Sequence, residues 1–149
     1  MTVRIPPPAW AALFLLIAWA LGVLVPIPIP ILLFQRPLGA VLAIVGFCLG
    51  LWAGVIFLRV GTELEPASES NRTLVVRGPF RFTRNPMYLG MLTTSAGIAL
   101  LVGMWSMFLA PLAFFFWVNT ISIPFEEAKM ERQFGPAYRS YKGQVRRWV

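Results

Sequence analysis

The stretch Arg77–Gly90, RGPFRFTRNPMYLG, decides how this chain is organised, because it places a basic turn between two apolar halves. Its glycine-proline pair predicts a turn. The Asn85-Pro86 pair predicts a helix start, since Asn is a favoured N-cap and Pro suits the first helical position. Together with Arg84, the unpaired N–H groups of that first turn form an anion-binding site. The alternative is a basic loop between membrane helices whose arginines reach anionic lipid.

The composition on both sides of this stretch is that of a membrane protein. Of the 149 residues, 58% are hydrophobic and only 13% are charged. A water-soluble domain carries about twice that charged fraction. We therefore predict an all-α integral membrane protein that forms one domain over residues 1–149. Its expected transmembrane helices, judged by length and hydropathy, are residues 9–25, 38–58, 86–102 and 104–123.

Glycine and proline indicate how these segments connect and pack. A cleaved signal peptide is the alternative for residues 9–25, but that run leads into a proline-isoleucine connector at 26–37 rather than a small-residue cleavage site. The glycines at positions 39, 46, 50 and 54 fall near one face of the second segment, which predicts close helix packing. Residues 86–102 are short for a full span. The break at Gly103 predicts either a tight hairpin or one bent element.

Basic residues are distributed unevenly about the four segments. No charged side chain (Asp, Glu, Lys or Arg) falls inside a segment, so polar chemistry is expected at the membrane interface. With four spans, every Lys and Arg except Arg36 lies on one side, which the positive-inside rule assigns to the cytoplasm. We read the net charge of +7 as topology and expect no nucleic-acid partner. The sequence thus predicts a bacterial inner-membrane protein whose middle loop, residues 59–85, and tail, residues 125–149, meet in the cytoplasm.

The residue types that are missing limit the available chemistry. The chain has no histidine and a single cysteine, Cys48, and all six of its acids are glutamates. The commonest general base and the commonest metal ligand are therefore absent, and no thiolate cluster can form. We predict no metal site, and we expect chemistry to depend on Glu, Arg, Tyr, backbone groups or a bound cofactor.

The tail, Phe125–Val149, combines acids, tyrosines and a basic end. A Gly-Pro pair directly after Phe134 predicts one helix before it and a short second helix after it. On the first helix Glu127 shares one face with Met130, Glu131 and Phe134, whereas Glu126 shares another face with Lys129 and Gln133. A carboxylate on an apolar face needs a partner, so Glu127 is the better functional candidate and Glu126 is predicted to be a surface acid.

Over residues 77–149 these motifs resemble the isoprenylcysteine carboxyl methyltransferase and phospholipid methyltransferase superfamily. The family pattern is Gly-Pro-aromatic, Arg-His-Pro-x-Tyr-x-Gly, Glu-Glu-x-x-Leu, Phe-Gly-x-x-Tyr-x-x-Tyr and a basic end. The matching positions are Gly78-Pro79-Phe80, Arg84–Gly90, Glu126-Glu127, Phe134-Gly135, Tyr138 and Tyr141. The chain departs from the pattern at Asn85, where histidine is usual, and at Met130, where leucine is usual.

The resemblance implies a membrane enzyme that uses S-adenosyl-L-methionine. An arginine suits the cofactor's carboxylate, a glutamate its ammonium, and a tyrosine its adenine or sulfonium. No glycine-rich dinucleotide motif is present, which excludes the soluble Rossmann type of methyltransferase. By resemblance the catalytic residues are Arg84 and Glu127, and the cofactor-binding residues are Gly78, Pro79, Arg84, Asn85, Tyr88, Gly90, Glu127, Phe134 and Tyr138.

The expected acceptor is a lipid or another lipophilic molecule dissolved in the membrane. Because no imidazole is available to deprotonate an amine, the sequence favours an acceptor that is anionic at neutral pH, such as an isoprenylcysteine-like carboxylate. The alternatives are N-methylation of phosphatidylethanolamine, an NADPH-dependent membrane reductase, and a non-catalytic membrane protein. The sequence does not predict the oligomeric state.

Overall fold

The structure is a computed structural model that describes residues 5–27, 30, 34–59 and 74–149. Within these ranges the chain is helical and no strand is present, which confirms the predicted all-α fold. Most of the predicted middle loop, residues 60–73, lies outside the described residues. The elements are α1 (Pro7–Leu24), α2 (Gln35–Arg59), η1 (Gly78–Arg81), α3 (Pro86–Val102), η2 (Trp105–Phe108), α4 (Leu109–Trp117), η3 (Val118–Ser122), α5 (Ile123–Phe134) and α6 (Pro136–Gln144).

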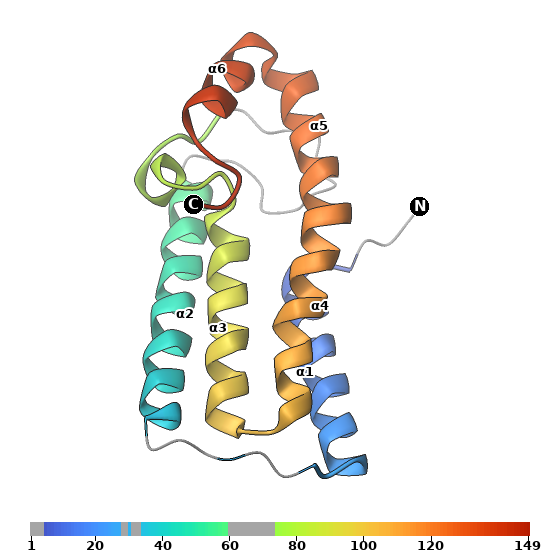
Figure 1. Cartoon of the computed structure of the whole chain (residues 1–149). Helices are drawn as coiled ribbons and strands as arrows, with labels where there is room; N and C mark the ends of the chain where they lie inside the picture. Colours follow the sequence, from blue (N-terminus) through green and yellow to red (C-terminus); the bar gives the residue numbers. More distant parts are fainter. Residues whose placement is uncertain (1–4, 28–29, 31–33, 60–73) are drawn as a thin grey trace.

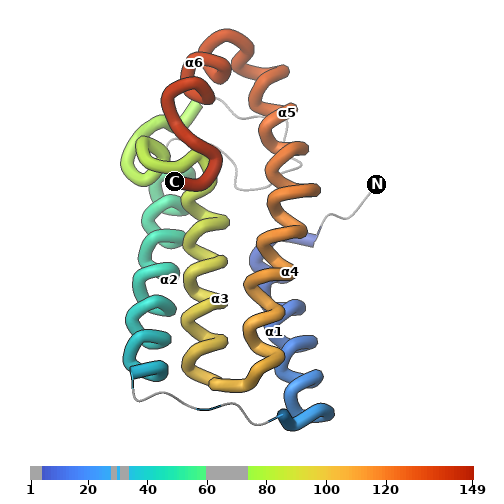
Figure 2. The backbone as a smooth tube through the Cα atoms, viewed as in Figure 1, coloured from blue at the N-terminus to red at the C-terminus, as the bar shows by residue number. Residues whose placement is uncertain are grey.

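The long helices form an up-and-down bundle (Figure 1). Helices α1 and α2, and the continuous helix Trp105–Phe134, are long and apolar enough to cross a membrane, and α3 is apolar but shorter. The end of α2, the start of α3 and the helices α5 and α6 lie at the same end of the bundle (Figure 2). These features establish a multi-pass integral membrane protein. They also bring the start of α3 and the tail together, as the sequence predicts.

Helices α2 and α3 pack with their backbones in close approach. A Cβ atom at Gly90 would lie 2.6 Å from the Gly50 nitrogen and 2.7 Å from the Gly46 carbonyl oxygen. Small residues permit such an approach between membrane helices. The predicted packing face on α2 is thus confirmed at Gly39 and Gly46, but it does not extend to Gly54, where a Cβ would meet nothing within 4 Å.

The break at Gly103 produces a hairpin between α3 and α4. Gly103 adopts a left-handed conformation, with φ of 70°, and caps the C-terminal end of α3, a conformation that glycine adopts without strain. The last apolar segment and the first tail helix, predicted as separate elements, are instead continuous. The π-helical turn η3 ends at Ser122, two residues before Pro124, whose ring and missing N–H disrupt a regular α-helix. This wider turn lets the helix pass the proline.

The outward faces of the bundle expose large apolar side chains. The exposed residues include Leu16 and Ile17 on α1 and Val41, Ile44 and Val45 on α2. Apolar area of this extent is stable when lipid covers it. The interior holds small clusters, one of which joins Ala11, Tyr88, Phe114, Val118 and Ile123.

Candidate active site

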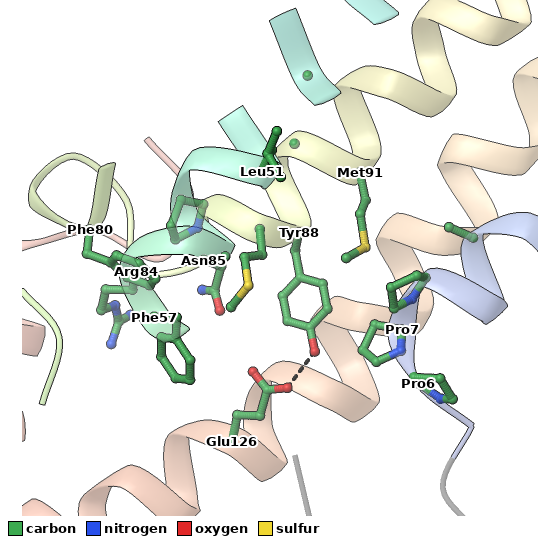
Figure 3. A pocket seen from close by; sticks show the side chains of 18 of the residues that line it. Pro6, Pro7, Leu51, Phe57, Phe80, Arg84, Asn85, Tyr88, Met91 and Glu126 are labelled. Carbon is green, nitrogen blue, oxygen red and sulfur yellow. Dashed lines mark hydrogen bonds between the residues drawn. The ribbon is translucent and has the colours of Figure 1, made fainter. Parts of the chain in front are cut away.

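A cavity of about 720 Å³ lies between α1, α2 and the first half of α3. Its walls are largely apolar and include Ala11 and Leu15 of α1, Leu51 and Phe57 of α2, and Met91 of α3. Polar groups gather where α5 and α6 contribute to the wall (Figure 3). These polar lining residues are Arg84, Asn85, Tyr88, Glu126, Glu127, Tyr138 and Tyr141.

Glu127 is the centre of an ion cluster at this end of the cavity. Nη2 of Arg84 lies 3.2 Å from Oε1 of Glu127. Arg147 contacts the same carboxylate at two points, with Nε 3.2 Å from Oε1 and Nη2 2.8 Å from Oε2. The Arg84 and Glu127 side chains are 9% and 12% exposed, respectively. Two guanidinium groups on one carboxylate leave a net positive cluster, which suits an anionic ligand.

Arg84 has donor capacity that the described residues do not use. Its Nε and Nη1 atoms are buried and make no hydrogen bond within the described part of the chain. An unsatisfied buried donor costs roughly 1–3 kcal/mol, and more when it is charged. Arg84 lines the cavity together with Tyr138. Burial raises the pKa of the Tyr138 hydroxyl, against an opposing effect of Arg84, so this group is uncharged at neutral pH.

The tail segment, residues 145–149, follows α6 and returns to the start of α3. The Arg84 N–H donates to the Arg146 carbonyl over 3.0 Å, and Nδ2 of Asn85 donates to the Arg147 carbonyl over 2.9 Å. Helix α3 begins at Pro86 as predicted, but the Asn85 side chain makes no capping bond to it. The side chain of Asn85 binds the tail segment instead.

Glu126 is the main correction to the sequence-based interpretation. It was predicted to be a surface acid, yet it lines the cavity and accepts a hydrogen bond from the Tyr88 hydroxyl (Figure 3). Glu131, predicted to share the face of Glu127, pairs with Arg139 instead, with Oε1 and Nη1 3.5 Å apart. The cavity borders the side of α5 that carries Glu126, Glu127 and Met130, and Glu131 and Phe134 do not line it.

The other predicted cofactor residues divide into two groups. Tyr88, Gly90 and Tyr138 line the cavity, and Gly90 also forms the close contact with α2. Gly78, Pro79 and Phe134 do not line it.

The Gly-Pro pair instead shapes the turn that carries Phe80. Gly78 has φ of +57°, a left-handed conformation that favours glycine, and Pro79 is fully buried. This turn presents the Phe80 carbonyl to the Tyr141 hydroxyl over 2.7 Å.

Sequence reasoning missed three residues that the structure places in or beside this site: Glu126, Asn119 and Arg147. Arg147 belongs to the basic end of the tail. The signal that could have found it is the need of Glu127 for a cationic partner. Asn119 has no comparable sequence pattern, because it lies in an apolar helix. Among the described residues no group of three or more His, Cys, Asp or Glu side chains is positioned to hold a metal ion.

Comparison with known proteins identifies the family. The family model for phospholipid methyltransferases matches residues 34–137. A protein of Haemophilus influenzae, described as uncharacterized, is 36% identical over 63 residues, which are 42% of this chain and the whole length of that relative. No solved structure matches the chain significantly. Because the family model covers well over half of the sequence, the chain belongs to the phospholipid methyltransferase family.

Proposed function

We propose that the protein is an S-adenosylmethionine-dependent methyltransferase whose acceptor is a lipophilic molecule dissolved in the membrane. Family membership supports methyl transfer. The cavity supports a lipophilic acceptor, since its walls are mostly apolar and its charged groups, Arg84, Glu126 and Glu127, gather at one end. We further propose that this end faces the cytoplasm of a bacterial cell, as the distribution of basic residues predicts.

The observation that carries the proposal is the pair of buried, unpaired donors on Arg84. Charge-assisted hydrogen bonds to a carboxylate, such as that of S-adenosylmethionine, would satisfy them. Glu127 receives three N–H contacts from Arg84 and Arg147. A carboxylate offers about four acceptor positions. This leaves capacity for an ammonium group, so the residues fit both charges of the cofactor's amino-acid end.

The remaining residues would bind and orient rather than form covalent bonds. The cofactor, when bound, supplies an electrophilic methyl group on a sulfonium sulfur. Tyr88 and Tyr138 offer aromatic faces that attract a sulfonium or stack on adenine. Apolar side chains such as Leu51 and Met91 would exclude water and hold the acceptor beside the methyl group. Holding two reactants in this geometry can remove a large part of the activation barrier.

Two acceptor classes fit this arrangement, and one observation supports each. The absence of histidine supports a carboxylate acceptor, such as an isoprenylcysteine-like compound, because a carboxylate needs no deprotonation before it attacks. Glu126 supports the second candidate, an amine such as that of phosphatidylethanolamine. Its carboxylate lines the cavity, where it would attract an ammonium group and repel an anion.

Calorimetric titration of the detergent-purified protein tests the proposal. We expect S-adenosylhomocysteine to bind and NADPH not to bind, with binding of S-adenosylhomocysteine lost in Arg84→Ala. Arg81→Ala is the matched control, because Arg81 lies three positions earlier with an exposed side chain. Binding of NADPH would favour the reductase alternative. Binding of neither ligand would favour a non-catalytic membrane protein.

A further inference from the structure

Hydrogen bonds and an ion pair hold the tail segment, residues 145–149, against the site. The family match ends at residue 137, so this segment lies outside it. Every nitrogen of the Arg147 guanidinium has a partner: Nε and Nη2 contact Glu127, and Nη1 lies 3.4 Å from Oδ1 of Asn119. The neighbouring Arg146 side chain is exposed. The two adjacent arginines therefore have different roles.

Asn119 binds two side chains of the tail segment and so orients it. Its Oδ1 accepts from Nη1 of Arg147 and, over 3.2 Å, from Nε1 of Trp148. Asn119 belongs to the π-helical turn η3, and such turns recur at functional sites. The Trp148 ring also packs on Phe115, with ring centroids 5.3 Å apart. Side chains from α4 and η3 thus hold Arg147 in one orientation.

The backbone of the tail segment is tied to the residues around Arg84. The Arg147 carbonyl accepts hydrogen bonds from Oγ1 of Thr83, over 3.1 Å, and from Nδ2 of Asn85, over 2.9 Å. The Arg84 N–H donates to the Arg146 carbonyl. Asn85, the departure from the usual histidine, therefore helps to seat the tail segment.

We infer that Arg147 is a positioning residue of the proposed cofactor site and that the tail segment completes this site. The inference rests on the proposed function. With Arg147 present, the cluster of Arg84, Glu127 and Arg147 is net positive and Glu127 is fixed at both oxygens. Without Arg147 the remaining pair is neutral, and Glu127 competes with the ligand's carboxylate for Arg84. The affinity for a carboxylate-bearing cofactor then falls.

The experiment combines ligand affinity with an independent report on the tail segment. The single cysteine, Cys48, is replaced in Cys48→Ser, and Val149→Cys then provides one site for a nitroxide label, since Val149 is 76% exposed. Calorimetry with S-adenosylhomocysteine gives affinity, and the label's electron paramagnetic resonance spectrum gives the mobility of the tail segment. The matched control is Arg146→Ala, which removes an adjacent, exposed arginine.

We expect Arg147→Ala to weaken S-adenosylhomocysteine binding by at least about tenfold and to mobilise the label, since Glu127, whose side chain is only 12% exposed, then loses a charged partner that contacts it at two points. Arg146→Ala should stay within about twofold, and Arg147→Lys should fall between the two, because lysine restores the charge without the two-point contact. Asn119→Ala, which leaves every charge in place, should mobilise the label and weaken binding less than Arg147→Ala.

Unchanged affinity in Arg147→Ala, with a mobilised label, would overturn the inference and reduce the segment to a structural element. Unchanged affinity and an unchanged label in Asn119→Ala would also count against it. If the parent protein does not bind S-adenosylhomocysteine, the proposed function fails and this inference fails with it. Binding by the parent that is insensitive to Arg147 overturns the inference alone.

Discussion

The Tyr88 hydroxyl donates a hydrogen bond to Oε1 of Glu126, which joins α3 to α5 at the wall of the cavity. The next residue, Glu127, is instead bound by two guanidinium groups. Two adjacent carboxylates therefore reach the same cavity in different electrostatic surroundings. Glu127 is paired with cations, whereas a tyrosine hydroxyl binds Glu126, and this difference is why we propose different tasks for them.

Glu126→Gln tests whether the second carboxylate serves an amine acceptor. Glutamine keeps the size of the side chain and an oxygen for the Tyr88 hydroxyl, but it removes the negative charge. We expect methyl transfer to phosphatidylethanolamine to fall by about 30-fold or more, because losing a charged partner costs about 2–5 kcal/mol. Transfer to a prenylcysteine-like carboxylate should be kept or should rise. Radiolabelled methyl transfer to each acceptor provides the measurement, and equal amine transfer by both proteins would contradict a role for Glu126.

The pH dependence of single-turnover methyl transfer separates the two acceptor classes. A carboxylate acceptor with a pKa of about 4 is ionised from pH 6 to pH 9, so its rate should be nearly flat across this range. An amine with a pKa of about 10 gains reactive free base roughly tenfold per pH unit over the same range. The rate is measured with saturating cofactor and each acceptor in turn. A flat profile with an amine would mean that the protein itself removes the proton, for which Glu126 is the candidate, since it lines the cavity and pairs with no arginine in the described part of the chain.

Arg84 and Glu127 should both be required for cofactor binding. Glu127→Ala leaves the buried Arg84 without its carboxylate partner, and Arg84→Ala removes the donors that we propose for the cofactor's carboxylate, so we expect S-adenosylhomocysteine affinity to drop by about 30-fold to several thousand-fold. Glu126→Ala should have a smaller effect, because Glu126 binds Tyr88 rather than an arginine. Calorimetric titration measures all three variants. Similar tolerance of the three substitutions would remove the basis for placing the cofactor here.

Gly90→Ala should destabilise the bundle. The new Cβ would lie 2.6 Å from the Gly50 nitrogen, and backbone atoms cannot yield as a flexible side chain does. Overpacking of this kind costs about 1–3 kcal/mol. The matched control is Gly54→Ala, at which a Cβ meets nothing within 4 Å. Thermal unfolding in detergent should show a lower midpoint for Gly90→Ala alone; a midpoint equal to that of the parent would refute the close-packed α2–α3 contact.

Topology is the last prediction. Reporter fusions after residue 149 and within residues 62–72 should both report the cytoplasm, and a fusion within residues 26–36 should report the opposite side. The reason is the placement of every Lys and Arg except Arg36 on one side of four spans. A periplasmic result from either of the first two fusions would rule out this orientation.

Local features of the sequence determined where the main elements begin and end. Pro86 starts α3, Gly103 ends it, and the Gly-Pro pair at 135 and 136 separates α5 from α6. These residues restrict backbone dihedral angles or lack an N–H, so their effect does not depend on distant contacts. The close packing of α2 was also predictable, because small residues recur on one face of an apolar helix. Arg84 and Glu127 were recognised from their motif.

Only the tertiary structure decided which side chains meet at the site. Helical periodicity assigns residues to faces, but it does not say which face borders the cavity, so Glu126 was placed outward. The contact of Asn85 with Arg147 joins residues 62 positions apart. Such pairs form only when the tail returns to the start of α3, and that return depends on Asn119, Trp148 and the path of the helix past Pro124. Folding thus converted two separate basic stretches of the chain into one cluster around Glu127.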